Sequence, residues 1–198
     1  LTNGSLFFLE NVRVDATLTD VVMPTLTAGS EEVFKQIHRS AEGITLSKVV
    51  DGLAKFRQIF KGQIWLEVML VKGLNDSEEE LRKIRKTVDL IKPDRVYVVT
   101  PIRPPAESWV EPASPEAMLK AQKILGNAEP ITELETGEFG LHEFTDACQA
   151  IMEIGSRHPL RREQAIEIEN TFSAPNTVRQ LIKEGKIVEV NYNDKQYV

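Results

Sequence analysis

The stretch Gln63–Asp76 restricts the possible folds of this chain more than any other segment. It is an apolar strand that stops at Gly73 and turns through Asn75 and Asp76. The residues Ser77-Glu-Glu-Glu80 follow directly and have the pattern of a helix start. Because the same succession of strand, polar turn and helix recurs along the chain, the sequence predicts an α/β fold with parallel strands. Ligands of such folds bind where the strands end.

Four strands, or ends of strands, are predicted at Leu1-Thr2, Asp20–Thr25, Ile64–Val71 and Arg95–Thr100. Both faces of these strands carry apolar residues, which is typical of a parallel sheet covered by helices on two sides. The chain opens in what resembles the end of a strand, so we expect the first part of the sheet to lie upstream. An uncovered edge at Leu1-Thr2 is expected either to associate with a second copy of the chain or to be disordered.

Apolar residues at helical spacing fill the segments between the strands. The predicted helices cover residues 30–37, 49–60, 77–91, 114–125 and 142–154. Ser30 is the expected N-cap of the first, and Ser77 and Glu80 form a predicted capping box on the third. Gly155 is expected to end the last. These elements predict a barrel-like parallel sheet with helices over residues 1–155.

Residues 156–198 have a different pattern. Short helices are predicted at 160–168 and 174–183, and the alternation of apolar and polar residues in 186–198 predicts a β-hairpin turning at Asn193-Asp194. This order is typical of a winged-helix-like unit. Its second helix carries polar residues that would face a nucleic-acid groove, namely Asn176, Arg179, Gln180 and Lys183. Since acidic and basic residues nearly balance there, a packing or protein-contact role is favoured over nucleic-acid binding.

The composition indicates an ordinary globular protein, with 41% hydrophobic residues and a net charge of −6. The charge argues against general binding of polyanions. The single cysteine, Cys148, excludes an internal disulfide and favours a cytoplasmic location. We expect no membrane association, because no apolar run approaches the roughly 20 residues that cross a bilayer.

Polar or functional side chains cluster at the predicted strand ends, where they would share one opening. They are Asn3, Thr25, Thr27, Glu67, Met69, Thr100 and Arg103. Threonine and asparagine also cap turns, and Met69 also suits a core. Glu67 is the most unusual, because a carboxylate within an apolar strand is costly unless it is paired or faces a polar cavity. Alternation places it on one face with Trp65 and Met69. A ligand contact and a buried pairing with Arg39 or Arg103 both remain open for it.

The proline-rich loop 102–109 carries Arg103 and Trp109 and is either a substrate-side loop or a structural crossover. No metal site is predicted, because His38, His142, His158 and Cys148 lack ligand spacing. A glycine-rich phosphate loop is also missing from the sequence.

Several motifs, in order, resemble the radical S-adenosylmethionine superfamily. They are Thr2-Asn3-Gly4, the run from Val22 to Arg39, and the run from Trp65 to Asp76. The similarity covers roughly residues 1–112 and is strongest to Fe–S oxidoreductases related to wyosine-synthesising and formate-lyase-activating enzymes. The resemblance implies a partial, TIM-like (β/α)6 barrel with parallel strands, in which S-adenosylmethionine binds a [4Fe–4S] cluster and yields a 5′-deoxyadenosyl radical.

The resemblance also implies cofactor contacts for individual residues. Asn3 lies at the end of the family's third strand, and Thr25 and Thr27 match the fourth-strand contacts to the ribose and amino-acid parts. Glu67 and Met69 match fifth-strand positions near the methionine tail and the adenine, and Thr100 the sixth-strand end. Relatives commonly carry aspartate at the position of Thr27 and an arginine-like residue at that of Glu67.

The cysteines that hold the family's cluster are absent from this chain and would lie before Leu1. The resemblance therefore implies the carboxyl-terminal part of a radical enzyme with an unknown substrate, inactive on its own. The alternative is a non-enzymatic scaffold derived from a barrel, whose winged helix binds a protein or nucleic-acid partner.

Overall fold

The computed structural model describes residues 1–126, 128–130, 141–157, 159–192 and 194–198. Contacts divide the chain into two compact units. The first contains Leu1–Pro101 and Trp109–Thr132, and the second contains Ile102–Ser108 and Glu133–Val198. The division falls earlier than residue 155, where the sequence pattern drew it, because helix α6 (Ala147–Arg157) packs with the helices that follow it.

The first unit is built on a parallel sheet, as predicted. Its strands are β1 (Val21–Val22), β2 (Thr25–Leu26), β3 (Gln63–Met69), β4 (Arg95–Val99) and β5 (Glu129–Pro130). β1 and β2 both pair with β3, β3 pairs with β4, and β4 pairs with β5. Thr2 forms a parallel bridge to Pro24, which adds the end of one more strand. Counting β1 and β2 as two parts of one strand, each strand lies beside the next one in sequence, as in a barrel.

The strand predicted at Asp20–Thr25 is interrupted at Pro24. Proline has no backbone N–H and cannot donate to a neighbouring strand. The carbonyl of Pro24 still accepts from the Glu67 N–H at 2.9 Å, so the chain stays in register with β3 on both sides of the break. The single predicted strand is therefore observed as β1 and β2.

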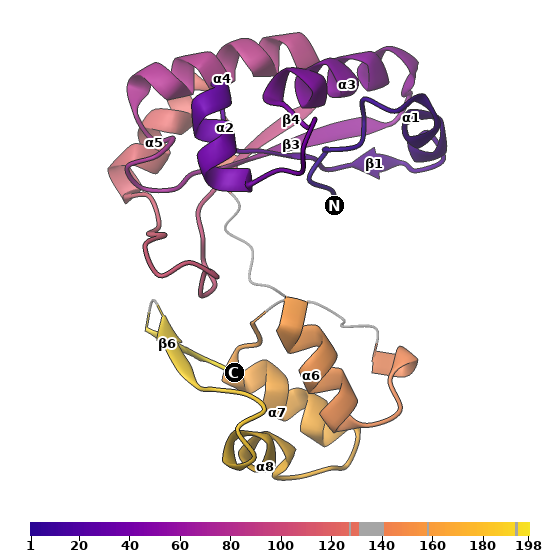
Figure 1. Ribbon diagram of the computed structural model, residues 1–198, viewed down its shortest axis with the longest axis vertical. Coiled ribbons are helices and arrows are strands. Elements are labelled where there is room, and N and C mark those ends of the chain that lie inside the picture. Colours follow the sequence, from indigo (N-terminus) through magenta and orange to yellow (C-terminus); the bar gives the residue numbers. More distant parts are fainter. Residues whose placement is uncertain (127, 131–140, 158, 193) are drawn as a thin grey trace. The chain divides into compact units, whose positions relative to one another are not determined.

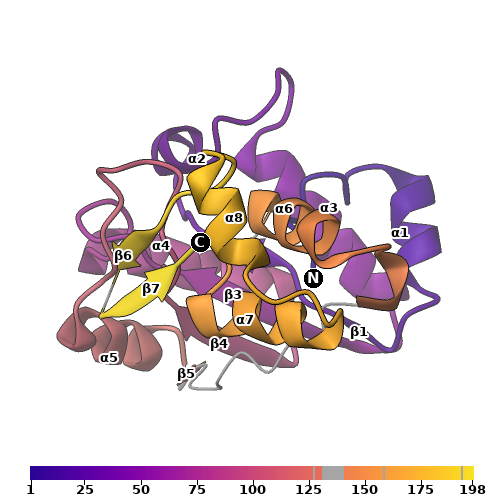
Figure 2. The same ribbon diagram turned by 90° about the horizontal axis from the view of Figure 1, so that it is seen from below.

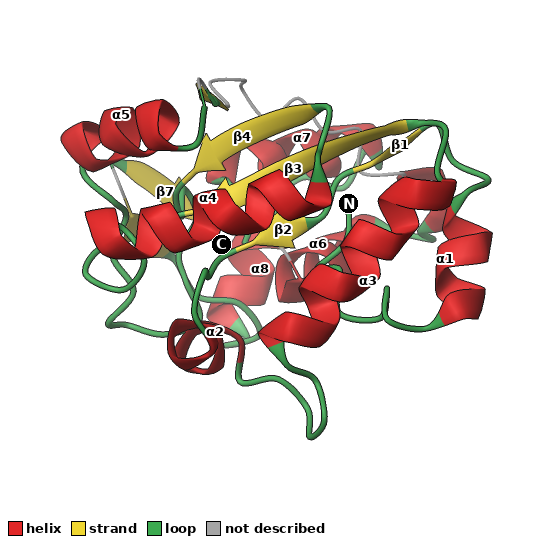
Figure 3. Cartoon of the chain, turned by 90° about the horizontal axis from the view of Figure 1, so that it is seen from above, coloured by secondary structure: helices red, strands yellow, loops and turns green. Residues whose placement is uncertain are grey.

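Helices cover one face of this sheet, as Figures 1 and 3 show. They are α1 (Glu10–Ala16), α2 (Glu31–His38), α3 (Leu46–Ile59), α4 (Glu78–Ile91) and α5 (Pro115–Ile124). The side chains of Ile64, Leu66 and Val68 on β3 are fully buried against this layer. Helix α1 was not predicted, because it buries none of its side chains and so has no apolar periodicity.

The other face of β3 differs from the sequence prediction. Trp65, Glu67 and Met69 are only half-buried and do not belong to the core of the unit. The expectation of helices on both faces is therefore wrong for the first unit, because the apolar residues on this face are interleaved with polar ones.

Two predicted helix caps are also corrected. Ser77 accepts from the Glu80 N–H at 3.2 Å, which is one half of the capping box on α4. The Glu80 carboxylate turns away from its own helix and accepts from the N–H groups of Gly29 and Ser30, both at 2.8 Å. Ser30 donates its hydroxyl to the same carboxylate and makes no side-chain cap of α2. A residue distant in sequence therefore caps α2.

The second unit contains short helices and a hairpin (Figure 2). Its elements are η1 (Leu141–Glu143), α6 (Ala147–Arg157), α7 (Arg162–Thr171), α8 (Thr177–Lys183), β6 (Val190–Tyr192) and β7 (Lys195–Tyr197). The antiparallel pairing of β6 with β7 confirms the predicted hairpin. Gly155 lies inside α6 instead of ending it. Leu160, expected in a helix, exchanges two backbone hydrogen bonds with Val198 because it packs into the core of this unit.

Within the described part of the chain, no helix has both the length and the apolar character that spanning a bilayer requires.

A glycine in α3 gives a test of this packing. A Cβ on Gly52 would lie 2.5 Å from the backbone carbonyl carbon of Phe7, so Gly52→Ala must push two backbones apart. We expect a loss of about 1–3 kcal/mol in the free energy of unfolding, measured in urea. Gly155→Ala in α6 is the control. Its Cβ has no neighbour closer than 3.9 Å, so alanine should be neutral or stabilising. Equal effects of the two substitutions would contradict the packing.

Candidate functional site

One polar row crosses the open face of the sheet. The register of the strands aligns Thr25 with Glu67 and Glu67 with Tyr97. Thr25 donates its hydroxyl to Glu67 Oε1 at 3.1 Å, and all three side chains are half-buried. The structure thus brings together two of the predicted site residues and adds Tyr97, which the sequence reading did not select. This row presents a carboxylate and hydroxyl groups to a ligand.

Trp65 adds a second aromatic ring beside Tyr97 of this row, towards the amino ends of the strands. Trp65 and Tyr97 form an edge-to-face pair with ring centroids 6.1 Å apart. The guanidinium of Arg95 lies over Trp65, 5.2 Å from the ring centroid, and donates to the Tyr97 hydroxyl at 3.2 Å. The open face therefore combines an apolar aromatic surface with the polar row, a mixture that suits a nucleoside or another amphipathic ligand.

Thr27, at the end of β2, is 1% exposed. Its hydroxyl lies 2.5 Å from Nε2 of His38, in the last turn of α2. Burial lowers the pKa of His38 below its ordinary value, because a half-buried imidazolium loses hydration. His38 is therefore neutral at pH 7, and its contact with Thr27 is a hydrogen bond between neutral groups that joins α2 to β2.

A cavity of 220 Å³ lies beside this pair, and Asn3 is among its lining residues. Its polar lining comes from Asn3, Ser5, His38, Arg39 and Ser40, and Phe34, Ile44 and Val49 supply apolar surface. Asn3 Oδ1 also accepts from the Ser5 N–H at 3.0 Å, the turn-capping role that its residue type allowed. The cavity has room for a small polar group or for one end of a larger ligand.

Asn75 is fully buried and connects two strand ends. Its Nδ2 donates to the carbonyls of Thr27 and Met69, at 2.6 and 2.8 Å. Its Oδ1 accepts from the Val71 N–H at 2.7 Å. The side chain of Met69 lies half-buried on the open face, next to Val99 of β4 in the register. Asn75 therefore fixes the backbone next to two predicted cofactor residues.

The hydroxyl of Thr100 is engaged within the protein. It donates to the Leu70 carbonyl at 3.0 Å and accepts from the Ala113 N–H at 2.8 Å. This side chain joins the ends of β3 and β4 to the segment that precedes α5. The contact to S-adenosylmethionine that the resemblance implies for Thr100 would therefore be made by its backbone atoms.

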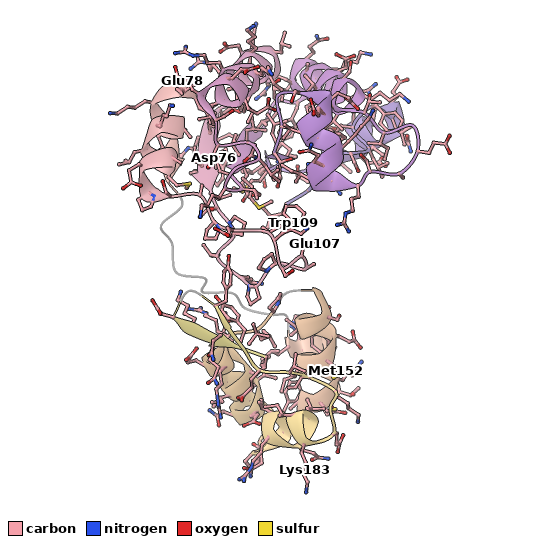
Figure 4. The ribbon with its side chains drawn as sticks, turned by 60° about the vertical axis from the view of Figure 1, so that its left-hand side comes forward. Asp76, Glu78, Glu107, Trp109, Met152 and Lys183 are labelled. Carbon is pink, nitrogen blue, oxygen red and sulfur yellow. The ribbon has the colours of Figure 1, made fainter. Side chains whose placement is uncertain are left out.

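The two predicted substrate-side residues belong to different units. Arg103 lies in the second unit, within Ile102–Ser108. Trp109 belongs to the first unit and is 50% exposed. Figure 4 labels Trp109 after β4 and Asp76 after β3, both in loops that follow the carboxyl ends of strands.

Among the described residues, no group of three or more histidine, cysteine, aspartate or glutamate side chains is arranged to hold a metal ion.

Sequence reasoning missed three features of the site, each with a weak signal in the sequence. They are Tyr97, Asn75 and the contact between His38 and Thr27. Tyr97 lies in a strand of ordinary composition, and His38 was weighed only as a metal ligand. The position of Tyr97 opposite Glu67 depends on strand register, which the sequence does not specify.

No protein-family model matches the chain. Among curated proteins, it is 45% identical over 123 residues to a GTPase Obg of Brachyspira hyodysenteriae, covering 62% of the chain and 18% of that protein. It is 28% identical over its whole length to a UPF0026 protein of Methanocaldococcus jannaschii, of which it covers 63%. A Helicobacter pylori UPF0026 protein is 34% identical over 52% of the chain and 33% of that protein. The chain thus spans less than two thirds of each of these relatives.

Two solved structures share the fold. One is a domain of pyruvate-formate lyase-activating enzyme from Bacteroides vulgatus, with a TM-score of 0.52 and 10% identity over 65% of this chain and 76% of that one. The other is a radical SAM methyltransferase from Sphaerobacter thermophilus, with a TM-score of 0.53 and 12% identity over 69% of this chain and 40% of that one. These similarities confirm the predicted fold, a partial barrel with parallel strands.

The buried histidine predicts a pH dependence of stability. Below the ordinary histidine pKa of about 6.5, the unfolded chain binds a proton that the native state resists, because burial lowers the native pKa of His38. The stability that neutral His38 contributes is complete above that pH and is lost as the pH falls through its native pKa. The free energy of unfolding, measured in urea, should therefore fall less between about pH 7.5 and 5.5 in His38→Gln than in the wild type. His142→Gln, at an exposed site, is the control. An identical loss in His38→Gln and the wild type would contradict this prediction.

Proposed function

We propose that this chain is the carboxyl-terminal part of a radical S-adenosylmethionine enzyme and binds that cofactor on the open face of β3 and β4. The observation that carries the proposal is the row formed by Thr25, Glu67 and Tyr97 on the side of the sheet that the helices of the first unit leave uncovered. The fold shared with a radical SAM methyltransferase supports it. Since a fold does not fix a function, the activity rests on the site residues.

The residues present suit S-adenosylmethionine, which has a cationic sulfonium, an amino group, ribose hydroxyls and an adenine ring. The carboxylate of Glu67 attracts positive charge and accepts hydrogen bonds from ribose or amino groups. Thr25 orients that carboxylate by donating to Oε1. Trp65 and Tyr97 offer aromatic surface to the adenine. Asn3 and the neighbouring cavity would receive a polar end of the cofactor.

The iron–sulfur cluster does not fit the residues of this chain. Cys148 is the single cysteine of the sequence and lies on α6 in the second unit, whereas three thiolates are needed. The cluster ligands would therefore come from polypeptide outside this chain, and the roles proposed here are limited to binding and orientation. The chemistry that S-adenosylmethionine would supply at such a cluster is a radical start to the reaction. Trp109 of the first unit is proposed to face the substrate, and a substrate-side role for Arg103 stays a prediction.

GTPase activity is not part of the proposal, although one similar protein carries that name. The sequence contains no G-x-x-x-x-G-K-[ST] loop, which cradles the phosphates in P-loop GTPases.

The second unit supports a second candidate function, as a docking module with a winged-helix-like order of elements. Arg161, between α6 and α7, bridges antiparallel to Tyr197 of β7, so a short extended segment joins the hairpin. We propose a protein partner, since acidic and basic residues nearly balance from Arg157 onward. We expect the chain not to be retained on duplex DNA at about 150 mM salt. Retention that weakens steeply with salt would instead favour a nucleic-acid partner.

Cofactor binding is testable with S-adenosylhomocysteine, a stable analogue. Calorimetric titration of the 198-residue chain should give saturable binding, and Glu67→Ala should weaken it at least about tenfold, or about 1.4 kcal/mol. The carboxylate of Asp51 is exposed on α3, on the helical side, so Asp51→Ala should bind like the wild type. Equal affinity of Glu67→Ala and Asp51→Ala would rule out the proposed role of Glu67.

The enzymatic proposal is tested on the polypeptide that carries this chain together with a C-x3-C-x2-C segment. After reconstitution with iron and sulfide and reduction, incubation with S-adenosylmethionine should release 5′-deoxyadenosine, detected by mass spectrometry. A reconstituted protein that bears a cluster and releases none would overturn the proposal.

A further inference from the structure

The carboxylate of Glu80 performs its main structural task outside its own helix. Glu80 lies in the first turn of α4 and is 4% exposed. Its Oε1 accepts from the Gly29 and Ser30 N–H groups at 2.8 Å and from the Ser30 hydroxyl at 2.9 Å. These donors belong to Thr27–Ser30, here called the β2 exit segment. A negative carboxylate at this place also complements the positive N-terminal end of α2.

A second residue from the same stretch of chain holds the start of the β2 exit segment. Asn75 donates to the Thr27 carbonyl at 2.6 Å, and its other two hydrogen bonds join the end of β3. Asn75 and Glu80 are five positions apart, on either side of the Ser77 cap. The stretch from Asn75 to Glu80 therefore holds the β2 exit segment at both of its ends.

The close approach of the backbones strengthens this attachment. A Cβ on Gly29 would meet the backbone of α4, at 2.6 Å from the Lys83 carbonyl carbon and closer still to the Ile84 nitrogen. Only glycine permits the exit segment to lie so near to α4. The exit segment thus rests directly on α4 and has little freedom to move.

The consequence reaches the cavity through α2. The N-terminal end of this helix follows the exit segment, and its last turn carries His38, with Arg39 directly after it. Both residues line the cavity that also contains Asn3. Helix α2 is eight residues long and is held at its start by Glu80 and near its end by the contact of His38 with Thr27. A change at Glu80 is therefore transmitted to the cavity wall.

We propose that Glu80 and Asn75 are positioning residues of the ligand site: by fixing the β2 exit segment they set the place of α2, and with it His38 and Arg39 in the cavity wall. This inference rests on the proposed function where it concerns the cofactor. Neither residue touches the cavity, and each acts through the backbone of the exit segment. Supporting contacts of this kind decide how accurately a binding site is held.

The test compares Glu80→Ala and Glu80→Gln in the 198-residue chain. Glu80→Ala leaves the Gly29 and Ser30 N–H groups without their acceptor, so α2 should loosen and its amide exchange should accelerate at least about tenfold. The pKa of His38, measured by NMR, should rise toward its ordinary value as the ring gains water. Affinity for S-adenosylhomocysteine should fall at least about tenfold. Glu80→Gln keeps one acceptor oxygen, so its α2 amide exchange, its His38 pKa and its affinity should stay close to those of the wild type.

Val88→Ala is the matched control. Val88 lies on the same helix, is buried in the core, and makes none of the contacts to the exit segment described above. The substitution Val88→Ala should lower the melting temperature while leaving the His38 pKa and the exchange rates of the α2 amides as in the wild type. If Glu80→Ala resembles Val88→Ala in these two measurements, the proposal is wrong.

The NMR and exchange measurements separate this inference from the proposed function. A wild-type chain that fails to bind the analogue counts against cofactor binding, whereas the His38 pKa and the α2 exchange still decide whether Glu80 positions the cavity wall. If Glu80→Ala does not fold, Asn75→Ala, which removes the hydrogen bond to the Thr27 carbonyl, is measured in the same two ways. A wild-type His38 pKa together with wild-type α2 exchange in that variant would overturn the proposal.

Discussion

Strand β3 is hydrogen-bonded along both of its edges, and the arrangement of the first unit depends on this pairing. It pairs in parallel with β1 and β2 on one side and with β4 on the other. Because side chains alternate along a strand, this pairing sends Ile64, Leu66 and Val68 into the helical layer. Glu67 is thereby directed to the face on which Thr25 and Tyr97 lie. One strand thus separates the core from the candidate site.

The polar groups at the strand ends divide into two kinds. Thr27, Asn75 and Thr100 use their side chains for internal hydrogen bonds. Those of Asn75 and Thr100 join one strand end to the next, and that of Thr27 joins β2 to α2. Such bonds satisfy buried polar groups whose desolvation would otherwise be costly. Thr25 and Glu67 bond to each other, half-buried, on the face that the helices of the first unit leave uncovered. Residue type alone does not distinguish the two kinds.

Features governed by local spacing were predictable from the sequence. The strands around Leu66 and Val98, the cap at Ser77 and the C-terminal hairpin follow from apolar periodicity and turn residues, and all are observed. Features that depend on distant partners were not predictable. The carboxylate of Glu80 had a plausible local partner in a capping box, yet it bonds residues about 50 positions earlier in the chain. The grouping of Thr25 with Glu67 was anticipated, but Tyr97 joins them only through the register of β4.

The central claim is that the open face of β3 and β4 receives an adenosine-containing cofactor. The most direct measurement is a crystal structure of this chain with S-adenosylhomocysteine. Our account predicts the ligand against Glu67, Thr25 and Tyr97, with one end directed to the cavity beside Asn3. Ligand bound instead in the groove lined by Arg85, Asp89 and Lys92, away from Glu67, would contradict it.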